Sequence, residues 1–151
     1  MFKHGIFTIK LINTKLNNAV INALCKNYVN ANIEWSQLDN SLTIHDKGLS
    51  EIEKEMIELD LVFFDQNPTV PLENLCSHLN NYTPKNTSQE EMLYYAHKLV
   101  AIEDDSIGAG LYIFGEAGVG KSHVSVGVSK LFMKKGLSPI FQFADRFTFG
   151  M

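Results

Sequence analysis

The sequence predicts an α/β protein with a small α+β module at its start and a strand-loop-helix core in its second half. Residues 5–79 switch between the two-residue apolar alternation of strands and the helical spacing of apolar residues. Residues 111–132 change from a short apolar run to a helical pattern across a glycine-rich turn. The polar stretch YTPKNTS lies between these regions, so the expected division is 1–82, 83–88 (a linker) and 89–151.

The first module is expected to have the element order β-α-β-β-α. A strand over 5–12 is followed by a helix that opens at Thr14, and two short strands at 33–38 and 42–45 are joined by a turn. Apolar residues at helical spacing predict the buried side of that first helix: Leu16, Val20, Ala23, Leu24 and Tyr28.

A longer helix is expected to close this module. Ser50 and Glu53 form a capping-box pattern at its start, and the residue before Pro68 is disfavoured in a helix, which marks its end. Its apolar stripe is expected to consist of Ile52, Met56, Leu59 and Phe63. Residues 72–79 predict one more short helix.

The core is expected to begin with a helix and then to alternate strands and helices. Ser88 and Glu91 repeat the capping-box pattern, residues 111–114 predict a buried strand, and residues 139–143 predict the next strand. Gly136 stands where the second helix of the core would be capped. The expected apolar faces are Met92, Tyr95, Ala96, Leu99 and Val100 in the first helix, and Val124, Val128, Leu131 and Phe132 in the second.

The composition indicates a globular chain. The formal net charge is −4, and 13 cations against 17 acids lack the basic footprint of a dedicated nucleic-acid binder. No apolar run reaches the ~18 residues of a membrane span, and no targeting segment is visible, so we expect a soluble, cytoplasmic protein. Cys25 and Cys76 are expected to be buried free thiols, and Cys76 with His78 lacks the further ligands of a zinc site.

Residues 115–122 read GEAGVGKS, a complete GxxxxGK[ST] phosphate loop between a predicted strand and a predicted helix. Its glycines permit unusual backbone angles, and the start of the following helix offers N–H donors to an anion. Lys121 is expected to reach the β- and γ-phosphates of ATP, and the Ser122 hydroxyl is expected to ligate Mg²⁺. The expected ATP-binding residues are Gly115, Glu116, Ala117, Gly118, Val119, Gly120, Lys121, Ser122 and His123.

Less specific interpretations accompany these assignments. A glycine-rich turn between a strand and a helix can be only a tight turn, although the full motif with Lys121 and Ser122 is far more specific. Glu116 is expected to be a solvated loop charge rather than a catalytic base. His123 is expected to be a surface or packing residue rather than a proton-transfer group.

Residues 110–147 resemble the start of the AAA+ core in bacterial replicative-helicase loaders and in the related transposon-helper ATPases. His123 directly follows the loop, the next helix ends in Met133–Gly136, and Ala144-Asp145 follows the second strand, as in many of these proteins. The resemblance extends over residues 86–149. It implies a partial P-loop NTPase (AAA+-like) core, ATP and Mg²⁺ as ligands, and a replicative helicase as partner.

The resemblance also implies limits. The family core is a parallel sheet of about five strands, of which this chain has the first two, and parallel sheets need cover on both faces. We therefore expect the two strands to pack on the first module, to pair with a partner chain or to self-associate; the alternative is that the segment is a fragment of a longer protein. The family's Walker B acid, sensors and arginine finger lie further along; Asp145 is too close to the loop to be that acid, and Arg146 is no credible finger. We expect ATP hydrolysis by this chain to be very slow or absent.

Three functions stay open at this point. The first is ATP binding of the helicase-loader type, and the second is a non-catalytic interaction protein that uses a partial AAA+ scaffold. The third, a small phosphotransferase, is weaker, because no arginine cluster is present to clamp an acceptor phosphate. Within residues 1–82, six lysines against ten acids disfavour a DNA role. The helix at 51–64 is then the better candidate for a protein-binding surface, and the alternative, which we favour for the helix as a whole, is that its apolar stripe only packs the core of the module.

Overall fold

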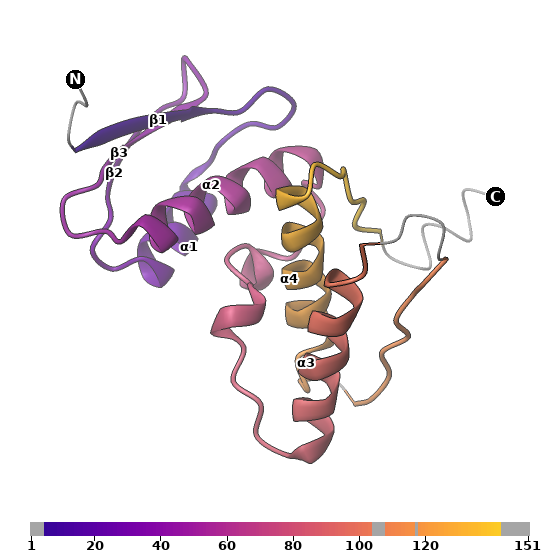
Figure 1. The fold of residues 1–151 in the computed structure, drawn as a ribbon. Helices are drawn as coiled ribbons and strands as arrows, with labels where there is room; N and C mark the ends of the chain where they lie inside the picture. Colours follow the sequence, from indigo (N-terminus) through magenta and orange to yellow (C-terminus); the bar gives the residue numbers. More distant parts are fainter. Residues whose placement is uncertain (1–4, 104–107, 117, 143–151) are drawn as a thin grey trace. The chain divides into compact units, whose positions relative to one another are not determined.

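A computed structural model describes residues 5–103, 108–116 and 118–142 of the chain (Figure 1). The fold is mixed α/β, with a three-stranded antiparallel sheet and four α-helices over these residues. The chain divides into two compact units, one running to Cys76 and resuming at Ile140, the other spanning Ser77–Pro139. No helix in these described ranges is long and apolar enough to cross a membrane.

The sheet belongs to the first unit and consists of β1 (Ile6–Lys10), β2 (Asn32–Ser36) and β3 (Ser41–His45). Its order is β1-β3-β2 with both pairs antiparallel, so β3 is the central strand. Leu42 and Ile44 of β3 are fully buried and lie on one face of the sheet. The same face carries their cross-strand partners, which are Phe7, Ile9, Ile33 and Trp35. The strands expected in the first module are thereby confirmed.

Two helices complete the first unit and lie on one side of the sheet, α1 (Asn18–Asn27) and α2 (Glu51–Gln66) (Figure 1). The side chain of Asn17 caps α1 by accepting a hydrogen bond from the Val20 amide. The helix therefore begins later than the start expected at Thr14. The capping box of Ser50 and Glu53 at the start of α2 is confirmed in both of its hydrogen bonds.

The stripe expected on α2 is confirmed at Phe63, which is buried, but the buried side as a whole is rotated by about one residue from the expected one. Ile52 is 64% exposed, whereas Ile57 and Leu61 are fully buried. Asp60 is also fully buried, because its carboxylate accepts a 2.5 Å hydrogen bond from the hydroxyl of Tyr28 in α1. Burial, and then the neighbouring carboxylate, raise the pKa of Tyr28 far above its ordinary value, so the hydroxyl remains a donor. Because Asp60 is polar, the spacing of apolar residues alone does not place it on the core side of α2.

The loop between β1 and α1 is held by side chains from two distant parts of the first unit. Asp65, near the end of α2, accepts hydrogen bonds from the backbone N–H groups of Ile12 (3.0 Å), Asn13 (2.8 Å) and Thr14 (2.8 Å). Asn40, in the β2–β3 turn with a φ of 54°, accepts from the Leu16 amide and donates to two carbonyls of the same loop. This loop is thus tied to α2 and to the hairpin turn through its backbone, although Ile12 and Asn13 themselves are exposed.

The segment that leaves α2 forms turns rather than the single short helix expected at 72–79. Two 3-10 turns occur instead, η1 (Leu72–Asn74) and η2 (Leu79–Asn81), the second of which belongs to the second unit. Cys76 is a buried thiol outside any disulfide, as expected, but Cys25 is exposed, which corrects the expectation of two buried thiols. Cys25 falls on the outer side of the short helix α1, whose buried residues are Val20, Ile21 and Leu24.

The second unit is built on α3 (Thr87–Val100) and α4 (Lys121–Lys134), which pack side by side (Figure 1). Asn86 caps α3, so the capping box expected at Ser88 is wrong by two residues. The unit's core contains Ala96 and Val124, both fully buried, together with Leu79. Partly buried apolar residues complete it: Tyr82, Met92, Leu93, Leu111, Ile113, Val128 and Leu131.

Neither strand expected in the core is formed over the described residues. Leu111–Phe114 and the described part of 139–143 have no strand assignment, and no parallel sheet is present among the described elements. The second of these segments begins a return to the first unit, where the Phe141 amide donates to the Asn67 side chain at 2.8 Å. Ala144, Asp145 and Arg146 lie outside the described residues.

Candidate phosphate-binding loop

The glycine-rich segment forms an open turn that leads directly into α4. Gly118 and Gly120 have φ values of 87° and 94°, which L side chains rarely adopt. Gly120 is the N-cap of α4 and gives it no side-chain hydrogen bond, whereas a side chain caps each of α1, α2 and α3. The first N–H groups of α4 therefore lack the partner that a capping side chain would supply. Such a helix start favours an anion.

Two of the three motif residues that carry polar side chains, Lys121 and Ser122, lie at this helix start. Lys121 is the first residue of α4, and its ammonium donates a hydrogen bond to the Gly115 carbonyl, which folds the side chain back across the loop. Ser122 is exposed, and so is Glu116. Ala117 lies outside the described residues. The lysine, the serine and the helix start thus lie on one short stretch of accessible surface.

Tyr82 braces this loop from the turn that precedes α3. Its hydroxyl donates to the Val119 carbonyl at 2.8 Å. A Cβ placed on Gly120 would lie only 2.5 Å from the Tyr82 ring. Gly120 is therefore required twice, for its left-handed backbone and for the close approach of the ring.

His123 connects α4 to η2 and does not point toward the loop opening. Its Nε2 lies 2.9 Å from the His78 carbonyl and 2.7 Å from Asn81 Oδ1, so this nitrogen carries the donated proton. Its ring also lies 5.3 Å from the ring of Tyr82. These contacts support a packing role for His123 over a proton-transfer role.

The environment of His123 makes the second unit sensitive to acid. Burial is the main cause that lowers the pKa of His123, and Lys130 and His78 lower it further, against an opposing contribution from the His78 carbonyl. The folded unit therefore prefers the neutral ring. Its stability is complete above the ordinary histidine pKa of ~6.5 and falls as the pH drops through and below that value.

We expect His123→Gln to reduce this loss, because its amide can keep donating to the same two acceptors without titrating. The measurement is urea unfolding at pH 8 and pH 5.5, followed by the NMR signals of α4, with exposed His97→Gln as the matched control. A loss of stability at low pH that is identical in all three proteins would contradict the role given to His123.

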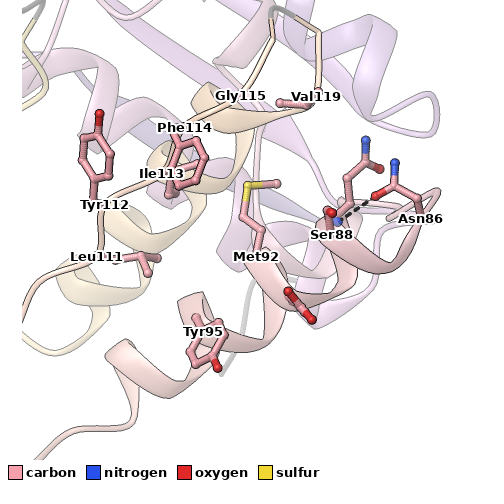
Figure 2. A pocket seen from close by; sticks show the side chains of 12 residues that line it. Asn86, Ser88, Met92, Tyr95, Leu111, Tyr112, Ile113, Phe114, Gly115 and Val119 are labelled. Atoms are coloured by element: carbon pink, nitrogen blue, oxygen red, sulfur yellow. Dashed lines mark hydrogen bonds between the residues drawn. The ribbon is translucent and has the colours of Figure 1, made fainter.

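A pocket of about 420 Å³ lies beside the loop, between α3 and the segment that precedes the motif (Figure 2). Met92 and Tyr95 line it from α3, and Leu111 and Ile113 line it from the segment. Its upper edge reaches Gly115 and Val119 of the loop. The walls are mostly apolar, so the pocket suits apolar side chains better than phosphates.

Sequence reasoning missed the residues that hold the loop from behind. His78, Asn81 and Tyr82 contact the loop or the first turn of α4, although they precede the motif by more than thirty residues, as the separation of 37 between Tyr82 and Val119 shows. No spacing rule links them to the motif. The only sequence signal was an aromatic residue within a polar stretch expected to be a linker.

The described residues contain no group of three or more His, Cys, Asp or Glu side chains placed to hold a metal ion. The chain matches no protein-family model, no curated protein and no solved structure. The site must therefore be interpreted from its own residues.

Proposed function

We propose that the chain binds ATP with Mg²⁺ at residues 115–122. The observation that carries this proposal is the arrangement at the start of α4, where the uncapped helix and Lys121 follow a loop with left-handed glycines. Anions bind where several backbone N–H groups and a cation converge on one point. A triphosphate would displace the Gly115 carbonyl as the partner of the Lys121 ammonium.

Magnesium would reach the site with the nucleotide rather than through a protein cage. Ser122 offers one exposed hydroxyl, and Mg²⁺ usually keeps several waters and takes its other ligands from the phosphates. The residues present therefore fit a Mg²⁺ ion that arrives bound to ATP. Bound Mg²⁺ would neutralise part of the phosphate charge.

Replacing Lys121 by alanine is expected to weaken ATP binding by more than tenfold, which corresponds to about 1.4 kcal/mol. The measurement is a titration of a fluorescent ATP analogue with Mg²⁺ against the full chain. Lys85→Ala is the matched control, because Lys85 is an exposed lysine of the same unit outside the loop. Equal ATP affinity of the wild type and Lys121→Ala would contradict the assignment of residues 115–122 as the ATP site.

The resemblance to helicase loaders extends this proposal to a protein partner. In that reading the first unit engages a replicative helicase while the second unit holds ATP. The acidic balance of residues 1–82 supports a protein partner over DNA.

The alternative is an interaction protein whose glycine-rich turn has no ligand. The packing role of His123 and the bracing by Tyr82 are equally compatible with a loop that only turns the chain into α4. The titration separates the two functions, because a scaffold would not bind the ATP analogue with or without Lys121.

A further inference from the structure

We propose that Leu111–Phe114 is a dimerisation strand, which pairs antiparallel with the same segment of a second copy of the chain. This inference does not depend on nucleotide binding. It starts from the backbone of the segment. Over the described residues, none of its N–H or C=O groups makes a hydrogen bond. An extended segment with free donors and acceptors is a template for another strand.

The side chains of this segment alternate as those of a strand do. Leu111 and Ile113 pack against the core of the second unit, whereas Tyr112 is 85% exposed and Phe114 is 78% exposed. The two exposed rings stack on each other with their centroids 5.8 Å apart. One side of the segment is thus fixed to α3 and α4, and the other presents two aromatic rings to solvent.

A second copy of the chain can supply the missing hydrogen bonds and cover the exposed rings, because the segment is complementary to itself. A pairing centred on Ile113 places Tyr112 of each copy opposite Phe114 of the other, on the same face of the new ladder. Aromatic cross-strand pairs stabilise antiparallel strands. The two copies are related by a two-fold axis, and their pairing occupies one edge of each segment.

Charge also favours the second copy as the occupant. Gly108 to Gly115 carry no charged residue, and the first acid beyond them, Glu116, would lie opposite Gly110 of the other copy. No like charges therefore face each other across the ladder, although the whole chain has a net charge of −4. An apolar, uncharged run without proline is the sequence type that pairs with itself.

The test is sedimentation equilibrium of the full chain, whose monomer mass is 17.0 kDa, from low micromolar to several hundred micromolar concentration. We expect a monomer–dimer equilibrium. Tyr112→Lys is expected to raise the dimer Kd by at least about tenfold, because it removes both Tyr112–Phe114 ring pairs and places two ammonium groups on the same face of the ladder. Leu137→Lys is the matched control, since Leu137 is 58% exposed in the same unit but outside the segment.

Cysteine cross-linking reports the register directly. In a Cys25→Ser background, a mixture of Tyr112→Cys and Phe114→Cys chains is expected to form a mixed disulfide faster than either variant alone, because paired strands hold opposite Cα atoms at about 4.5–5.5 Å. A monomer at every concentration would overturn the proposal. So would a dimer that Tyr112→Lys leaves intact, or open-ended oligomers. Lys121→Ala is expected to leave the dimer unchanged, which separates this inference from the nucleotide proposal.

Discussion

Asp65→Ala is expected to destabilise the first unit by about 3 kcal/mol. The substitution removes the acceptor of three backbone N–H groups, those of Ile12, Asn13 and Thr14. A buried donor that loses its partner costs about 1–3 kcal/mol, and these three bonds are partly buried, so their summed loss is expected to reach about 3 kcal/mol. The single tryptophan of the chain, Trp35 in β2, belongs to this unit, so its fluorescence during urea unfolding measures the effect.

Two further variants sharpen this test. Asp65→Asn retains the oxygen that accepts from Asn13 and Thr14 but presents an amide nitrogen to the Ile12 N–H group, so an intermediate loss is expected. Glu58→Ala removes an exposed acid of the same helix and is expected to change the stability by less than about 0.5 kcal/mol. If Asp65→Ala and Glu58→Ala behave alike, the three hydrogen bonds do not stabilise the fold.

Gly127→Leu is expected to destabilise the second unit by about 2 kcal/mol or more, because extra volume in a close contact costs about 1–3 kcal/mol. A Cβ on Gly127 would lie 2.8 Å from the backbone nitrogen of Leu79 and 3.0 Å from the carbonyl carbon of His78. These are backbone atoms, which yield less easily than the end of a side chain. The unfolding of α3 and α4 in urea, followed by NMR, measures the change.

For Gly127→Ala, helix propensity and the close contact predict stability changes of opposite sign. By helix propensity alone, alanine in the middle of α4 stabilises by about 1 kcal/mol relative to glycine. The contact with the backbone at Leu79 predicts the opposite sign. Ser125→Leu, at an exposed position of the same helix, is the control for the general effect of a leucine. A stabilising Gly127→Ala would mean that α4 and the η2 turn do not lie as close as described.

Helices, strands and caps were predictable from the sequence where the residues that determine them are close together in the chain. The strands of the first unit, the capping box of α2 and the C-terminal cap of α4 at Gly136 all follow from residues within a few positions of one another. The rotation of α2 was not predictable in this way. Its core side includes Asp60, and only the distant Tyr28 makes a carboxylate acceptable there.

The prediction of a parallel sheet in the second half of the chain was wrong for a different physical reason. Leu111–Phe114 has the composition of a buried strand, but a strand requires a neighbour to complete its hydrogen bonds. The described residues supply none, so the sequence pattern produces an extended segment with half of its apolar side chains in solvent. The motif itself was visible from the sequence, whereas its support by Tyr82 and Asn81 depends on chain packing.

The loop between β1 and α1 has a consequence for the motions of the first unit. Surface loops usually open on their own, and their amides exchange with solvent long before the domain unfolds. The amides of Ile12, Asn13, Thr14 and Leu16 are instead held by side chains of Asp65 and Asn40, which belong to α2 and to the hairpin turn. Releasing these protons requires the loop to detach from the side chains of Asp65 and Asn40. The amides of this loop are therefore expected to exchange more slowly than those of an untethered surface loop, which native-state hydrogen exchange measures.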